Sequence, residues 1–250
     1  MIHRRFRTVA LLLLLGGAVA AAPEPGQQPE AQQPVASDVN ERFLDPDLDV
    51  ETWTERFETE SREIYVVREA IVATLGLRSG MAVADIGAGT GLFLEPFARS
   101  VGLEGRVYAV EISPRFLEHL RDRAEREGLS RAQVVTGSER SPELPAGAVD
   151  VAFVCDTYHH FAYPQSMLAN LYRALRPGGA LVVIDFERIP GVTRDWVLGH
   201  VRADKQTFRT EIESAGFVFE KEAEIEGLVE NYLLIFRRPE QAPVAPAGTP

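Results

Sequence analysis

The chain has 250 residues, of which 45% are hydrophobic and 25% charged, and a formal net charge of −11 at pH 7. This composition is ordinary for a globular α/β protein with a sizeable core, and the lack of a basic patch argues against a nucleic-acid partner. The single cysteine, Cys155, excludes a disulfide framework and the cysteine spacing of a zinc site.

The first 22 residues have the pattern of a secretory signal peptide. Basic residues at 3–7 precede an apolar run from Val9 to Leu15 and a small-residue segment in which Ala18-Val19-Ala20 has the form of a cleavage site. The stretch from Thr8 to Ala22 is shorter than the ~20 residues that a membrane-spanning helix needs. We therefore expect an exported protein, periplasmic or secreted, with no stable membrane span. Anchoring by an uncleaved leader is the alternative.

Two segments are predicted to be disordered. Residues 23–37 contain four prolines and four glutamines and have almost nothing to bury, which is typical of a linker. Residues 239–250 form a similar tail that is rich in proline and alanine. The folded domain is therefore expected over residues 38–238.

Within that domain, short apolar runs alternate with longer amphipathic segments, which predicts βαβ units and a parallel sheet. The expected helices are residues 62–77, 90–101, 114–127, 164–175 and 205–215. The expected strands are residues 82–86, 106–110, 133–136, 149–155, 180–186, 218–224 and 231–237, with a turn at Pro177-Gly178-Gly179. Only residues 225–230 join the last two strands, too few for a crossover helix, so we expect these strands to pair antiparallel.

A glycine loop follows the first expected strand. Gly87, Gly89 and Gly91 lie where an open parallel sheet binds its ligands, at the carboxyl end of a strand near the switch point. A dinucleotide fingerprint would need a third glycine at the position of Leu92. Asp85 would oppose a pyrophosphate and favour a ligand with a cationic amine. S-adenosylmethionine has such an amine and carries no phosphate.

Glu111 lies at the end of the second expected strand, twenty residues after Gly91. A carboxylate at this place can accept hydrogen bonds from both hydroxyls of a ribose. Together with Asp85 it favours S-adenosylmethionine over a nicotinamide dinucleotide.

Four segments now carry a resemblance: VADIGAGTG at 83–91, VYAVEIS at 107–113, residues 150–161, and LRPGGALVVIDF at 175–186. In these segments the chain resembles the class I S-adenosylmethionine-dependent methyltransferases, specifically the small-molecule type. The resemblance implies a Rossmann-like, mostly parallel seven-stranded sheet of order 3-2-1-4-5-7-6, with an antiparallel last strand and helices on both faces. It also implies a lid over the cofactor, formed by a helix before strand one that carries Trp53, Phe57, Tyr65 and Arg68.

The same resemblance assigns the cofactor residues. Ser138 and Glu139 would flank the adenine, although many relatives have an aspartate at the position of Ser138. Asp156 would lie near the methionine part. The complete expected set is Asp85, Gly87, Ala88, Gly89, Gly91, Glu111, Ser138, Glu139 and Asp156.

The candidate chemistry follows strand four, where His159 and His160 are adjacent. Methyl transfer mainly requires alignment of the acceptor with the methyl group, and a base helps when the acceptor is a hydroxyl or a protonated amine. Histidine titrates near neutrality, so we expect one of the two to contact the acceptor or act as the base; a packing role is the alternative. A metal site would draw on Asp156, His159, His160, Asp185, Glu187 and His200. No short-range ligand spacing supports one, and we expect no metal.

The sequence thus predicts an exported methyltransferase acting on a small molecule, with oxygen, nitrogen, sulfur and carbon all open as the acceptor atom. The alternative is a non-catalytic exported binding protein that keeps the fold, because a fold does not by itself imply a function. The sequence gives no indication of the oligomeric state.

Overall fold

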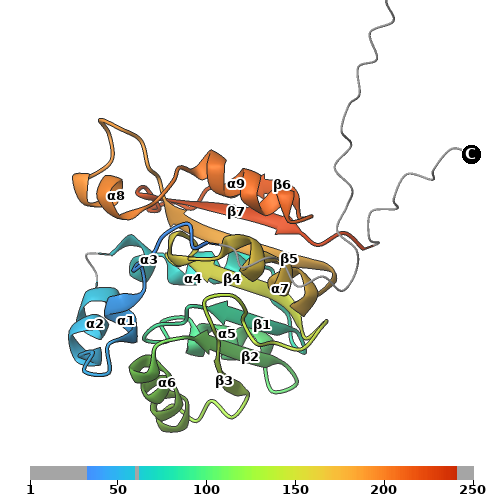
Figure 1. The fold of residues 1–250 in the computed structure, drawn as a ribbon. Coiled ribbons are helices and arrows are strands. Elements are labelled where there is room, and N and C mark those ends of the chain that lie inside the picture. Colours follow the sequence, from blue (N-terminus) through green and yellow to red (C-terminus); the bar gives the residue numbers. More distant parts are fainter. Residues whose placement is uncertain (1–32, 60–61, 241–250) are drawn as a thin grey trace, which may run out of the picture. The chain divides into compact units, whose positions relative to one another are not determined.

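The computed structural model describes residues 33–59 and 62–240, and these contain one seven-stranded sheet (Figure 1). The strands are β1 (Ala82–Ile86), β2 (Arg106–Glu111), β3 (Ala132–Thr136), β4 (Val149–Cys155), β5 (Leu175–Phe186), β6 (Val218–Glu222) and β7 (Asn231–Arg237). Their order is β3-β2-β1-β4-β5-β7-β6, and β7 runs antiparallel to both of its neighbours while all other pairs are parallel. The predicted fold class and strand order are confirmed. The predicted signal peptide, most of the linker and nearly all of the tail lie outside the described residues.

The central strands are buried on both faces, which explains their continuous apolar runs. Side chains alternate between two cores: in β1, Val83 packs on one face and Ala84 on the other. Helices α4 (Arg68–Thr74) and α5 (Leu94–Val101) cover the first face, whereas α7 (Pro164–Ala174) and α9 (Lys205–Ser214) cover the second. The carboxyl ends of the parallel strands therefore remain free to form a site.

Helix starts follow local chemistry. The hydroxyl of Ser113 accepts from the amide of Phe116 and Pro114 is the first residue of α6 (Pro114–Arg126). The carboxylate of Asp204 caps α9 in the same way, through the amide of Thr207. These caps fix where the chain turns from loop to helix.

The helix predicted over residues 62–77 is instead two short helices, α3 (Glu63–Val66) and α4, with a break at Val67. The apolar periodicity continues through the break, but the carboxylate of Glu63 accepts backbone amides of residues 229–231 at 2.7–3.0 Å. The start of α3 is thus bound to a segment distant in the sequence. Such a contact leaves no trace in local periodicity.

Two further predicted boundaries differ. The helix expected from residue 90 begins at Leu94, because the amide of Gly91 bonds the Ala88 carbonyl and that of Leu94 bonds the Gly91 carbonyl in a turn. The turn expected at 177–179 lies inside β5, where the pairing with β4 jumps from Leu175 to Ala180.

Three elements are not predicted by the sequence: α1 (Glu41–Leu44), the 3-10 helix η1 (Tyr158–His160) and α8 (Asp195–His200). Helix α2 (Val50–Phe57) is expected only as part of the lid helix. Helices α1, α2 and α8 lie toward one end of the sheet, at the left of Figure 1. The expected lid helix is divided, because Trp53 and Phe57 belong to α2, Tyr65 to α3 and Arg68 to α4. Among the helices of residues 33–59 and 62–240, none is long and apolar enough to cross a membrane.

Candidate cofactor and acceptor site

One cavity of about 630 Å³ lies at the carboxyl ends of β1, β2 and β4. The loop after β1 and the end of β2 line one side, and the segment after β4 lines another. Aromatic side chains of α1, α2 and α8 also face it. The cavity is large enough for a cofactor and a second small molecule to share.

The glycine loop forms the tightest part of the wall. Gly87 has φ +76°, and a Cβ added to it would lie 2.4 Å from the Cγ2 atom of Thr157, so no larger residue fits where the loops after β1 and β4 touch. Gly87, Ala88 and Gly89 line the cavity. Gly91 does not, because it lies against α6, where an added Cβ would be 2.9 Å from Leu120.

Glu111 is held by backbone amides. Its Oε1 atom accepts from Ile112 at 2.6 Å and Ser113 at 2.9 Å, and its Oε2 atom accepts from Gly89 at 2.9 Å. Burial raises the pKa of Glu111, and these amide hydrogen bonds oppose the rise. A carboxylate has about four acceptor positions, so Oε2 keeps one for a ligand hydroxyl.

Asp85 is buried without a hydrogen-bond donor from any other described residue. Burial, and then the charge of neighbouring Glu111, raises the pKa of Asp85 to about 8. A cationic group entering the cavity would therefore stabilise the ionised form of this side chain.

Asp156 also lines the cavity, and its backbone has a left-handed conformation with φ +47°. Its carboxylate pairs with Arg62 and accepts from the side-chain amide of Asn231 at 2.5 Å. Burial raises the pKa of Asp156 to about 6, although Arg62 acts against the rise. Arg62, which precedes α3, and Asn231, the first residue of β7, reach Asp156 only through the tertiary fold.

Ser138 and Glu139 also line the cavity. Glu139 accepts from the side-chain amide of Asn40 at 3.0 Å, and the hydroxyl of Ser138 bonds the Ser141 carbonyl at 3.4 Å. Contacts of these two residues with an adenine remain a prediction.

Side-chain hydrogen bonds hold the end of helix α2 against the glycine loop. At its carboxyl end, Glu58 accepts from the Thr90 hydroxyl at 2.7 Å and from Arg123 at 2.6 Å. The ring of Phe57 lies near Gly89, since an added Cβ there would be 3.8 Å away. The α2 segment thus occupies the position expected of a lid.

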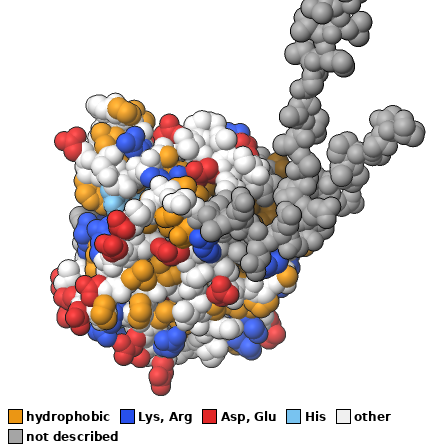
Figure 2. Space-filling view, viewed as in Figure 1, with side chains coloured by type: hydrophobic (Ala, Val, Ile, Leu, Met, Phe, Trp, Pro, Cys, Tyr) orange, Lys and Arg blue, Asp and Glu red, His pale blue; other side chains and the backbone are white. Residues whose placement is uncertain are grey.

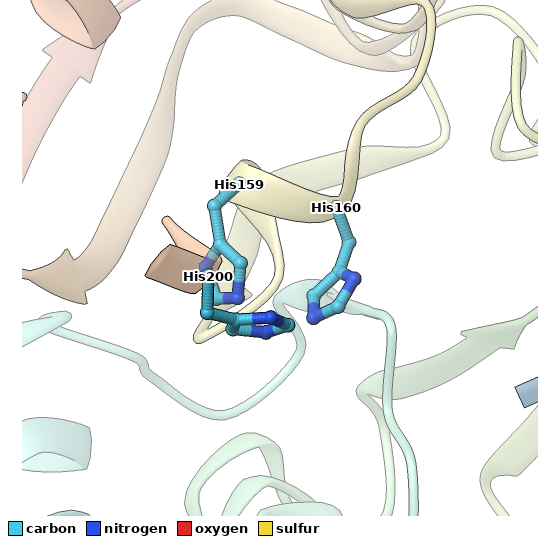
Figure 3. Close-up of side chains that lie close together, drawn as sticks. All are labelled: His159, His160 and His200. Atoms are coloured by element: carbon cyan, nitrogen blue, oxygen red, sulfur yellow. The ribbon is translucent and has the colours of Figure 1, made fainter. Parts of the chain in front are cut away.

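Three histidines meet in the part of the cavity that η1 and α8 line (Figure 3). His159 is 2% exposed, and its Nδ1 atom lies 2.8 Å from Oδ1 of fully buried Asp185. The Nδ1 atom of His160 lies 3.3 Å from the Val39 carbonyl. His200 comes from α8, and ring centroids in the trio are 4.3–5.0 Å apart.

Two histidines of the trio, His160 and His200, have lowered pKa values. Burial, followed by the neighbouring His159 and His200, lowers the pKa of His160 to about 2. Burial and His159 lower the pKa of His200 to about 4. Neutral imidazoles offer lone pairs to a proton or to a cation.

The comparisons with known proteins agree with this geometry. A family model described as a methyltransferase domain matches residues 84–183. The structure of an S-adenosylmethionine-dependent methyltransferase from Aquifex aeolicus has the same fold, with a TM-score of 0.66 and 23% identity, over 76% of this chain and 98% of that one. Residues 84–183 are thus similar to a methyltransferase domain, and the described residues share the fold of the Aquifex aeolicus protein.

Relatives match part of the methyltransferase domain. The ubiquinone/menaquinone biosynthesis C-methyltransferase UbiE of Neisseria gonorrhoeae is 32% identical over 118 residues, which are 47% of this chain and 48% of the relative. The UbiE of Bordetella parapertussis is 33% identical over 118 residues, 47% and 45% of the two chains. The chain spans about half the length of the curated relatives it matches.

S-adenosylmethionine is the cofactor that the sequence predicts, and the residues that line the cavity fit it. Asp85 offers a buried carboxylate that lacks a donor, which suits the cofactor's ammonium group. The Gly87 turn leaves no side chain between backbone and ligand. The free position on Oε2 of Glu111 suits a ribose hydroxyl.

Proposed function

We propose that this chain is an S-adenosylmethionine-dependent methyltransferase that is exported and acts on a small molecule. The observation that carries the proposal is one cavity in which Asp85, the glycine loop and Glu111 share space with His159 and His160. A candidate cofactor site and imidazole side chains in the same cavity are what alignment and deprotonation of an acceptor require.

In the proposed reaction, the acceptor displaces the sulfur from the methyl group, and S-adenosylhomocysteine leaves. Asp185 accepts from Nδ1 of His159, which leaves the Nε2 lone pair of that ring free to take a proton from the acceptor. Since the sulfonium already activates the methyl group, the protein's main contribution is orientation.

The acceptor is expected to have a flat, apolar part. Aromatic rings of α1, α2, α8 and β5 line the cavity: Phe43, Trp53, Phe57, Phe186 and Trp196. Of these, Phe43, Phe186 and Trp196 contact the histidines. Such rings favour stacking with a planar ligand. The relatives' names, which refer to ubiquinone and menaquinone biosynthesis, also support an aromatic ring as the acceptor class.

Calorimetric titration with S-adenosylmethionine tests the cofactor assignment. We expect binding to the wild type, at least about tenfold weaker binding to Asp85→Ala and Glu111→Ala, and unchanged binding to Glu118→Ala, which alters an exposed carboxylate of α6. A wild type that does not bind the cofactor at millimolar concentration contradicts the proposal. Binding without turnover on any of a panel of phenols and quinols favours the alternative, a non-catalytic binding protein.

A further inference from the structure

The histidine trio of His159, His160 and His200 has a geometry that methyl transfer alone does not require. Three of the chain's five histidines come together from two segments, η1 and α8. One ring nitrogen of each lies within 4.8 Å of the other two. Figure 3 shows the three rings facing one small volume.

Outer hydrogen bonds orient two of these rings. Nδ1 of His159 faces the Asp185 carboxylate, and Nδ1 of His160 faces the Val39 carbonyl. Both partners only accept, so each Nδ1 carries a hydrogen, and a ring that binds an ion would do so through the lone pair of its Nε2 atom. A carboxylate or carbonyl behind the ring is the usual outer partner of a metal-binding histidine.

The spacing suits an ion after small side-chain movements. An ion equidistant from three nitrogens at the 4.8 Å limit would lie about 2.8 Å from each, against about 2.0–2.1 Å for zinc–imidazole bonds, so each ring moves by less than about 1 Å. His160 and His200 are only partly buried and can rotate. In the space-filling view, histidine reaches the surface beside basic side chains, which gives an ion a route in (Figure 2).

One cation already touches the trio. Nη2 of Arg42 lies 3.3 Å from Nε2 of His200, and within the described part of the chain no carboxylate pairs with Arg42. Repulsion by Arg42 would weaken the binding of a bare cation. An ion that brings an anionic oxygen as its fourth ligand would instead give Arg42 a partner.

We propose that His159, His160 and His200 bind a divalent transition-metal ion of the zinc type, with Asp185 as the positioning residue behind His159 and a fourth position open to an oxygen ligand in the cavity. Three imidazoles and one open position form a ligand set typical of catalytic zinc. The sequence led us to expect no metal, because positions 160 and 200 are too far apart for a spacing motif and α8 was not predicted.

The role of the ion rests on the proposed function, whereas its binding does not. A bound ion would lower the pKa of a coordinated acceptor hydroxyl, whose proton leaves to water. The resulting oxyanion forms the O–CH₃ bond as the S–CH₃ bond breaks, and S-adenosylhomocysteine is released. The histidines then act as ligands rather than as the base, and the acceptor class is a phenol or another hydroxyl compound.

Metal binding to the full chain tests the proposal. The protein is stripped with a chelator and titrated with Zn²⁺ alone against a chromophoric competitor, and with Co²⁺ alone while its visible absorption is recorded. We expect one tight equivalent and the intense absorption of four-coordinate Co²⁺. His160→Gln and His200→Gln should each weaken binding more than 100-fold, and Asp185→Asn by about 10–100-fold.

His119→Gln is the matched control, since this histidine lies on α6 outside the cavity. It should bind the ion as the wild type does. Circular dichroism and S-adenosylmethionine binding, measured on every variant, show that the fold is kept and that the cofactor site is separate. A wild type that binds Zn²⁺ no better than the double variant His160→Gln/His200→Gln overturns the proposal, as does equal loss in His119→Gln. A protein that binds Zn²⁺ but not S-adenosylmethionine would instead overturn the proposed function alone.

Discussion

At the scale of single residues, the cavity wall contains carboxyl groups whose surroundings are energetically unfavourable without a ligand. Asp85 is buried beside a second carboxylate and receives no hydrogen bond from another described residue. Asp156 has a left-handed backbone and a raised pKa. Strained or poorly solvated groups of this kind concentrate at functional sites, where a ligand supplies the missing partner.

The carboxyl of Asp85 predicts a pH dependence of stability. Its pKa is about 8 in the folded chain and about 3.9 when unfolded, so between these values the folded state holds a proton that the unfolded state has lost. The contribution of Asp85 to the free energy of unfolding is therefore fully present below about pH 4 and is lost as the pH rises through about 8. When the pH is raised from 5 to 8, the free energy of unfolding measured in urea should fall by at least about 1 kcal/mol more in the wild type than in Asp85→Asn. Equal losses would show that Asp85 does not carry this proton.

Gly87 and Gly128 separate backbone strain from steric contact. Both have positive φ, but an added Cβ meets Thr157 at Gly87 and nothing within 4 Å at Gly128. Gly128→Ala should lower the free energy of unfolding by about 1–2 kcal/mol through backbone strain alone. Gly87→Ala should lower it by about 1–3 kcal/mol more, because the added methyl group overlaps Thr157. In the Gly87→Ala background, Thr157→Ala should recover part of the difference, measured by denaturant unfolding. Equal costs at the two glycines would mean that the loops after β1 and β4 do not touch as described.

At the scale of elements, α2 is attached to the body by few groups. The Glu58–Arg123 pair is about 15% exposed on both sides, and Glu58 also receives the Thr90 hydroxyl. Partly buried pairs of this kind leave an uncompensated charge when one partner is removed.

Glu58→Gln should therefore release α2 from the glycine loop. We expect faster amide hydrogen exchange in residues 50–57 and several-fold weaker S-adenosylmethionine binding, because Phe57 no longer covers Gly89. Glu118→Gln removes the exposed partner of Arg115 and should change neither quantity. Unchanged exchange in α2 after Glu58→Gln would exclude this attachment.

At the scale of the whole molecule, export remains a proposal about residues that the structure does not describe. If the leader acts as a signal peptide, mass spectrometry of the protein recovered outside the cytoplasm should find a new N-terminus at residues 21–23. Leu13→Arg, which interrupts the apolar run, should keep the full-length chain in the cytoplasm, while Arg5→Lys should not. An intact Met1 on the recovered protein would favour the uncleaved anchor.

The sequence by itself determined the β-sheet and the glycine loop that follows its first strand. The signals are local: alternating apolar runs, a short last connection and a glycine loop after β1. Strand burial and turn geometry depend on residues that are neighbours in the sequence. Together with the family resemblance they predicted the strand order, and they place Asp85 and Glu111 at the strand ends that line the cavity. The role of these two residues in cofactor binding stays a prediction.

Only the tertiary structure decided the rest. Glu63, at the start of α3, accepts amides near β7, and Arg62 reaches Asp156 from another segment. His200 joins His159 and His160 from α8, a six-residue helix with no strong period of its own. These pairings depend on where the sheet places the ends of its strands, and long-range contacts of this kind have no signature in sequence spacing. For that reason the methyl donor could be predicted from the chain, whereas the metal-binding geometry of the acceptor side could not.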